Sequence, residues 1–146
     1  MKIVNVIGHP VSVMSMYLLL MISGEKMGGF YALFVFIRLF HGMPDAIVSA
    51  LGLGAMLLGY KVCRNHYHSI KTGLYLLGSG VMMIGLVMFF ETTGGYNSPT
   101  FHQGVPLFTF ALFGLFVLCN TWLALMLFFQ NMPGEDKKFR MSQKLE

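Results

Sequence analysis

Apolar residues run in long uninterrupted blocks along this chain, and polar residues gather in the short stretches between those blocks. Residues 72–90 contain no charged side chain across 19 residues, and residues 105–130 contain none across 26. Because an α-helix rises about 1.5 Å per residue, each block is long enough to cross a hydrocarbon core of about 30 Å. Both blocks are therefore predicted to be transmembrane helices.

A third apolar block, residues 45–62, carries clear signals at both of its ends. Asp45 is a favourable residue for the start of a helix, and the basic residues Lys61 and Arg64 mark the other end. Basic residues gather on the cytoplasmic side of a membrane, which predicts that this end faces inward. Residues 91–104 are rich in glycine and polar residues and have no Lys or Arg, so they are predicted to form an outer loop.

The first 44 residues allow two topologies. In the first, residues 9–24 and 26–42 both cross the membrane, which gives five spans with the N-terminus outside. In the second, residues 3–23 cross and residues 30–40 lie on the outer surface, which gives four spans with the N-terminus inside. The charge pattern favours five spans, and residues 30–40 are apolar nearly all round, as a spanning helix is.

The predicted fold class is an all-α, polytopic transmembrane helix bundle with short loops and a cytoplasmic C-terminus. The chain is 55% hydrophobic and 11% charged, whereas a soluble domain carries about 25% charged residues. Residues 1–132 are predicted to form the bundle and residues 133–146 a basic cytoplasmic tail. Because the tail also carries acidic residues and nothing else in the sequence suggests nucleic acid, no nucleic-acid partner is expected. The expected surroundings are a lipid bilayer, and the charge pattern and the lack of glycosylation motifs indicate a bacterial inner membrane.

Small residues at helical spacing predict where helices pack. Helices in a bilayer gain little from hiding leucine, so they associate where small side chains allow close contact between backbones. The predicted packing positions are Ala46, Ala50, Gly54 and Gly59 in the third block, and Gly78 and Gly85 in the fourth. The last block is instead rich in aromatic residues, which suits lipid or another membrane protein. Asn120, near its middle, needs a hydrogen-bond partner on a neighbouring helix.

Histidine offers the main candidate chemistry. With five spans, His9, His41 and His102 all fall at the outer face, where two imidazoles on facing helices would ligate a haem. Arg38, the lone charge in its apolar block, would bind Asp45, a quinone oxygen or a lipid phosphate. The alternative for all four residues is structural, with histidines at helix ends and an arginine reaching the interface. No metal is assigned, because the three histidines share no motif.

Function is less constrained than fold. No nucleophile motif, phosphate loop or dinucleotide fingerprint appears in the sequence. The leading hypothesis is an accessory or structural subunit of a larger membrane complex, contacting its partners, or a second copy, through the aromatic last helix. The first alternative is a membrane redox protein that binds haem b or quinone. The second is a small carrier or channel component whose short N-terminal helices build a site as a discontinuous element.

Overall fold

A computed structural model describes residues 2–24, 28–61 and 68–130 of the chain. Arg64 and the predicted tail, residues 133–146, lie outside the described residues. The elements in chain order are α1 (Lys2–Ile7), α2 (Pro10–Leu18), β1 (Met21–Ser23), β2 (Gly28–Phe30), α3 (Tyr31–Phe40), α4 (Pro44–Lys61), α5 (His68–Thr92), the 3₁₀ helix η1 (Gly94–Phe101) and α6 (Gly104–Gln130).

The helical fold predicted from the apolar blocks is confirmed, but the predicted four to five spans are not. Two helical segments, Ile70–Thr92 in α5 and Gly104–Phe128 in α6, are long and apolar enough to cross a membrane. A third candidate arises only if α3 and α4 are counted together, and these two helices are bent by 114° at their junction. By length and composition, the described part of the chain therefore has two candidate spans, or three if the bent pair is one span.

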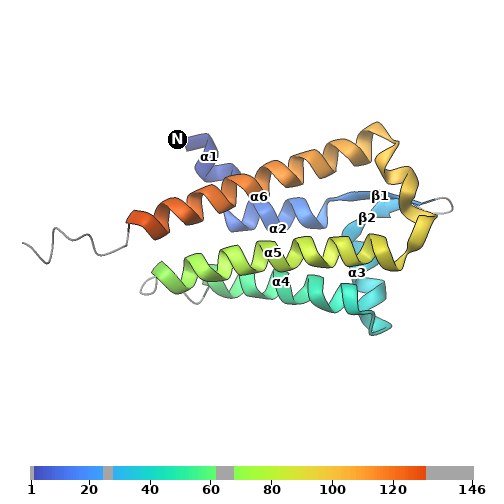
Figure 1. Cartoon of the computed structure of the whole chain (residues 1–146), viewed down its shortest axis with the longest axis horizontal. Coiled ribbons are helices and arrows are strands. Elements are labelled where there is room, and N and C mark those ends of the chain that lie inside the picture. The colour runs from blue at the N-terminus through green and yellow to red at the C-terminus, as the bar shows by residue number, and fades with distance from the viewer. Residues whose placement is uncertain (1, 25–27, 62–67, 131–146) are drawn as a thin grey trace, which may run out of the picture.

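Helices α4 and α5 form a tight antiparallel pair, with α2 held between this pair and α6 (Figure 1). The contact depends on small residues where the two backbones meet. A Cβ added at Gly52 would lie 2.8 Å from the backbone nitrogen of Met82, and one added at Gly78 would lie 3.0 Å from the backbone nitrogen of Met56. A Cβ at Gly52 would lie closer to backbone than real Cβ atoms come, and one at Gly78 would lie at that limit, so this helix spacing favours glycine at both positions.

The predicted packing positions divide between this contact and the surface. Ala46 is buried, and Cβ atoms added at Gly59, Gly78 and Gly85 would all meet α4 or α5 across the interface. Gly54 does not pack, because a Cβ added there would meet nothing within 4 Å. The actual α4 interface follows Ser49, Gly52, Met56 and Gly59, at alternating spacings of three and four residues, as the helical period requires.

The predicted spans 9–24 and 26–42 are wrong as continuous helices. The first contains the nine-residue α2 followed by β1, and the second contains β2 followed by the ten-residue α3. Ten residues of helix extend only about 15 Å, which is half of a hydrocarbon core. The strands β1 and β2 pair as a short antiparallel ladder, with Met21 opposite Phe30 and Ser23 opposite Gly28.

The backbone of this hairpin is not helical, so it lacks the hydrogen bonds that a helix makes within itself. Side chains from the last third of the chain bond to it instead. The backbone nitrogen of Ser23 donates to Thr100 Oγ1 at 2.9 Å, and the same hydroxyl donates to Ser23 O at 2.9 Å. The backbone nitrogen of Met21 donates to Thr109 Oγ1 at 3.1 Å. An apolar setting tolerates non-helical backbone only where protein groups satisfy it, and η1 and α6 meet that need here.

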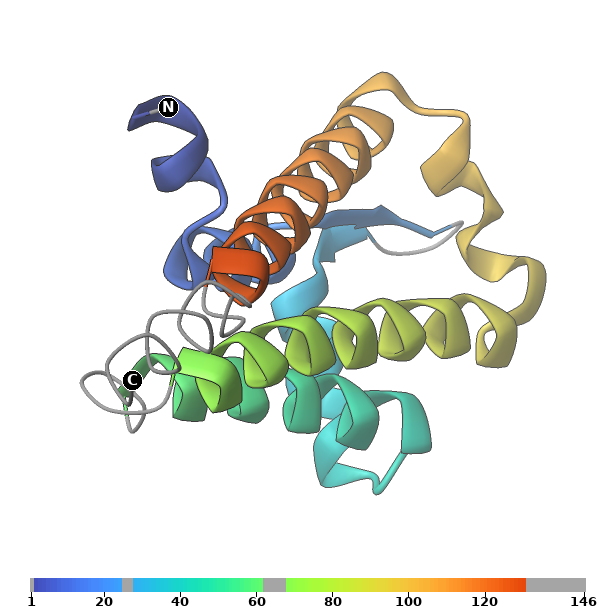
Figure 2. The ribbon, with the colours of Figure 1, turned by 60° about the vertical axis from the view of Figure 1, so that its left-hand side comes forward.

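The N-terminal helix α1 lies at the end of the bundle where α4 ends and α5 begins (Figures 1 and 2). We call this the basic end, because it carries Lys61 and Lys71, and we call the opposite end, where α5 ends and α6 begins, the far end. The ring of His9 packs edge-on against Tyr60 at 5.4 Å between centroids, which fixes the start of α2 at the basic end. The five-span topology places the start of this segment at the far end and is therefore wrong there.

Candidate functional site

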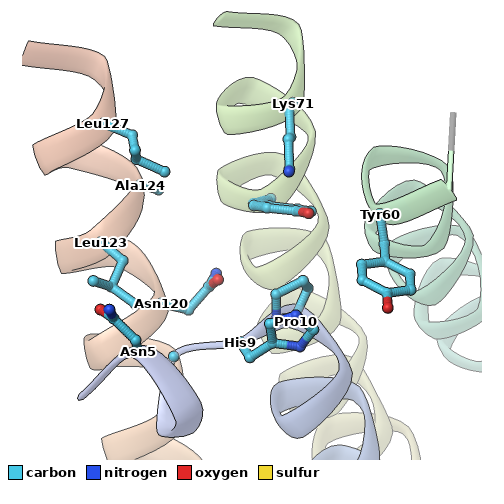
Figure 3. A pocket seen from close by; sticks show the side chains of 11 residues that line it. Asn5, His9, Pro10, Tyr60, Lys71, Asn120, Leu123, Ala124 and Leu127 are labelled. Atoms are coloured by element: carbon cyan, nitrogen blue, oxygen red, sulfur yellow. The ribbon is translucent and has the colours of Figure 1, made fainter. Parts of the chain in front are cut away.

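A cleft of about 520 Å³ opens at the basic end, between the α1–α2 corner, the start of α5 and the last turns of α6. We call it the basal cleft. Its volume falls in the range of about 300–1,000 Å³ that small-molecule sites occupy. The polar residues that line it come from four helices and from the α1–α2 corner: Asn5, His9, Tyr60, Lys71, Tyr75 and Asn120. Figure 3 shows the side chains that line the cleft from close by.

The break between α1 and α2 forms the floor of the basal cleft. Pro10 occupies the first turn of α2, and the backbone nitrogen of Val11 donates to His9 Nδ1 at 3.3 Å, which caps the helix. Gly8 lets the corner sit directly on α6, because a Cβ there would lie 2.9 Å from the backbone of Cys119. The sequence Gly8-His9-Pro10 thus ends one helix, starts the next and places an imidazole between them.

Asn120 lies in the wall of the basal cleft with its amide nitrogen unsatisfied. The residue is only 2% exposed, and Nδ2 has no hydrogen-bond partner among the described residues. Asn120 was predicted to bond to a neighbouring helix, and among the described residues its Nδ2 makes no such bond. A buried donor without a partner costs about 1–3 kcal/mol, so its retention calls for an explanation. In Figure 3 the amide points into the cleft toward the space below Lys71.

Lys71 supplies the charge of the basal cleft. It reaches into the cleft from the first turns of α5 (Figure 3), and its Nζ lies 5.9 Å from the centroid of the Tyr75 ring. A cation over an aromatic face is stabilised by the ring quadrupole, which keeps the ammonium group directed along the cleft wall. No acidic residue occurs among the described residues that line the cleft. The cleft therefore presents a cation and polar donors to whatever occupies it.

A second polar cluster lies deep in the bundle and is structural. The hydroxyl of Tyr17 lies 2.9 Å from Ser49 Oγ and 3.0 Å from the carbonyl oxygen of Met82, and the hydroxyl of Tyr31 lies 3.1 Å from Ser49 Oγ. The two tyrosines and Ser49 are fully buried, and the rings meet edge-on. Because these hydroxyls are satisfied by one another and by backbone, the cluster joins α2 and α3 to the α4–α5 pair.

Arg38 is held in an ion pair near the far end. Its Nε lies 2.8 Å from Asp45 Oδ2 and its Nη2 lies 2.7 Å from Asp45 Oδ1, which is the two-pronged geometry typical of arginine and carboxylate. Nη2 also donates to Thr92 Oγ1 at 2.9 Å, and the guanidinium carbon lies 5.3 Å from the Phe89 ring centroid. Of the three partners considered for Arg38, the structure shows Asp45, and these contacts join α3, α4 and α5.

The structure does not bring the candidate haem ligands together. His9 contacts Tyr60, about 24 Å along α4 from the corner that carries His41, at 1.5 Å per residue. His41 is exposed at the α3–α4 corner, where Nδ1 lies 2.8 Å from Ile37 O. His102 is exposed before α6, and these two corners lie at opposite edges of the bundle (Figures 1 and 2). The expected shared depth of the three histidines is wrong for His9.

The sequence marks some of the cleft residues individually, but it does not indicate that they lie together. Asn120 stands out as a polar residue inside an apolar block, Lys71 as part of a basic loop, and His9-Pro10 as an interruption of an apolar run. Tyr60 and Tyr75 give no sequence signal, because tyrosine near a helix end is common at membrane interfaces. What unites them is the tertiary position of the α1–α2 corner, which no local pattern specifies.

Comparison with known proteins gives no match: no family model, curated protein or solved structure is similar to this chain. The function is therefore inferred from the residues of the chain itself.

Proposed function

We propose that this protein is an integral membrane protein that binds a small anionic ligand in the basal cleft. The observation that carries the proposal is the buried Nδ2 of Asn120, a donor that faces the cleft and lacks a partner among the described residues. A bound acceptor would satisfy this nitrogen. The cost of keeping a polar group unpaired is otherwise difficult to reconcile with a purely structural role for the residue.

Charge and helix geometry support an anion rather than a neutral ligand. Lys71 brings a positive charge to the cleft, and its lining contains no described acidic residue to neutralise it. The broken helix at His9 resembles the discontinuous helices on which membrane carriers build their sites, where the break frees polar groups for a ligand. These features favour the carrier or channel alternative among the three functions considered from the sequence.

The proposal predicts a co-purifying ligand. The protein extracted gently from its own membrane is expected to carry the added mass of a small acidic molecule in native mass spectrometry. Lys71→Gln and Asn120→Leu are each expected to lower the bound fraction at least tenfold, because each removes one of the groups that would hold the anion. His102→Gln, which alters an exposed polar residue at the far end, is the matched control and should retain the ligand.

A wild-type protein that emerges without added mass, or variants that retain the ligand fully, would contradict the proposal.

The same spectrum tests a second candidate function, an accessory subunit of a membrane complex. That candidate is supported by α6, in which only 17% of the apolar window is buried, against 39% in α5. Fixed partner chains in the spectrum would support it, and a bare monomer would count against it.

We further propose that the basic end faces the cytoplasm, in a bacterial inner membrane. The support is the concentration of Lys61 and Lys71 at this end, together with the basic sequence that follows α6. In a chain with Cys63→Ser and Cys119→Ser, a membrane-impermeant maleimide applied to intact cells should label Gln103→Cys but not Lys61→Cys. Labelling of the second variant alone would reverse the orientation.

A further inference from the structure

A second hollow adjoins the basal cleft and has the opposite chemistry. It is a groove of about 410 Å³ between α2 and α4, and its lining is almost entirely apolar. Tyr60 belongs to the walls of both hollows, so the two adjoin at this residue. We call it the α2–α4 groove. Its apolar lining residues are Val11, Met14, Leu18, Leu53, Gly54 and Leu57.

Gly54 leaves the α2–α4 groove open. A Cβ added at this position would meet nothing within 4 Å, which contrasts with Gly52 two residues earlier, where it would strike α5. From Leu53 to Lys61 the groove follows about 12 Å of α4, at 1.5 Å per residue. Its free side is bordered by partly exposed leucines such as Leu18 and Leu57, which an apolar membrane interior would cover.

The two hollows together are polar at one end and apolar along their length. Lys71 and Asn120 lie in the cleft beyond Tyr60, and Lys61 lies at the end of the groove, so cations flank the junction on both sides. We propose that the occupant is an anionic amphiphile with a single hydrocarbon chain, whose acidic headgroup sits in the basal cleft and whose chain lies in the α2–α4 groove. This inference rests on the proposed function and names the ligand class.

The two parts of the ligand would contribute differently to binding. A hydrocarbon chain gains little by leaving lipid for an apolar groove, because lipid is as apolar as leucine. The headgroup therefore supplies the selectivity for charge, through Lys71 and the free donor of Asn120. The groove selects for shape, since it accepts a chain that continues from the headgroup and would exclude one if Gly54 carried a large side chain.

The test measures equilibrium binding to the full chain in nanodiscs of uncharged phosphatidylcholine. The probes are radiolabelled oleoyl lysophosphatidic acid, its zwitterionic counterpart oleoyl lysophosphatidylcholine, and inorganic phosphate. We expect the acidic amphiphile to bind at least tenfold more tightly than either of the other probes. Lys71→Gln should weaken that binding at least tenfold by removing the headgroup charge, and Gly54→Leu should do the same by filling the groove.

Gly80→Leu is the matched control, because Gly80 is an exposed glycine of α5 whose added Cβ also meets nothing within 4 Å. It should bind like the wild type. Thermal unfolding verifies that Gly54→Leu is folded, and Leu57→Trp, which narrows the same groove, replaces it if it is not. Reduced binding by whichever of these variants is folded supports the inference.

Two results would overturn the inference and separate it from the proposed function. If the groove variants bind the acidic amphiphile as the wild type does, or if inorganic phosphate binds as tightly in a Lys71-dependent manner, the chain has no part in recognition and only the anion site stands. If neither the acidic amphiphile nor phosphate binds to the wild type, the amphiphile inference and the anion site fail together.

Discussion

Replacing Arg38 by methionine is expected to lower the free energy of unfolding by about 3 kcal/mol, because removal of one member of a buried ion pair leaves the other charge buried without a partner. The stranded group is Asp45, which is 1% exposed, whereas Arg38 is 20% exposed and near a helix end. The arginine can reach water when it loses its partner, but the aspartate cannot. Arg38→Met should therefore be more destabilising than Asp45→Asn, as measured by denaturant unfolding in micelles.

A double substitution distinguishes the ion pair from simple loss of packing. Arg38→Met combined with Asp45→Leu removes both charges, and it should recover most of the lost stability, because apolar replacements of buried pairs are often neutral. Glu91→Gln removes an exposed carboxylate at the same end and should change little. If the loss of stability in the double variant equals the sum of the losses of Arg38→Met and Asp45→Leu measured singly, the contact between Arg38 and Asp45 does not carry the effect.

Gly52→Ala is expected to destabilise the bundle by about 2 kcal/mol, which is in the range for overpacking a close contact. The added methyl group would lie 2.8 Å from both Met82 Cγ and the Met82 backbone nitrogen, and 3.0 Å from Gly78 O. The Met82 side chain can move, but the backbone of α5 cannot do so without separating the two helices. Thermal unfolding in one detergent, compared across variants, measures the loss.

Gly54→Ala is the matched control for this prediction. It makes the same chemical change two residues along α4, where the methyl group meets nothing within 4 Å. Because alanine favours helix over glycine by about 1 kcal/mol, this variant should be as stable as the wild type or slightly more so. Equal losses at Gly52 and Gly54 would mean that the α4–α5 contact is not as close as the structure shows.

The long helices were predictable because their signals are local. Uninterrupted apolar blocks gave the extent of α5 and α6, and Asp45 and Lys61 bracketed α4. Each of these signals depends on length, charge or capping, which a single helix expresses without reference to its neighbours. The confirmed part of the prediction is therefore the helical architecture, with two or three helical segments long and apolar enough to cross a membrane.

The N-terminal third was not predictable by the same means. Met21, Ser23 and Phe30 lie in apolar sequence that suits helix, yet they form extended backbone. That conformation depends on hydroxyl groups of Thr100 and Thr109, more than seventy residues away. Tertiary contacts outweigh local preference here, and a sequence pattern contains no record of which distant hydroxyl will supply a hydrogen bond.

The sequence predicted that α4 packs closely against another helix, but it did not predict which of its small residues lie at the contact. The four-residue spacing of Ala46, Ala50 and Gly54 drifts around the helix, since four residues turn it by slightly more than one full turn. The interface follows Gly52 instead, which leaves Gly54 open to the α2–α4 groove. Composition thus indicated that α4 would pack closely against another helix. Only the structure shows that Gly52 contacts α5 and that Gly54 lines the α2–α4 groove.

The pairing of the N-terminal hairpin with the last third of the chain sets an order for biogenesis. The backbone of Met21 finds its partner at Thr109, 88 residues later. At about 5–20 residues per second, the ribosome needs roughly 4 to 18 s to synthesise that interval. Helices α4 and α5, which are adjacent in sequence, can associate during this time. The N-terminal hairpin is therefore synthesised first but reaches its final structure among the last. Until α6 has been synthesised, its backbone hydrogen bonds must be made with the insertion machinery or with water.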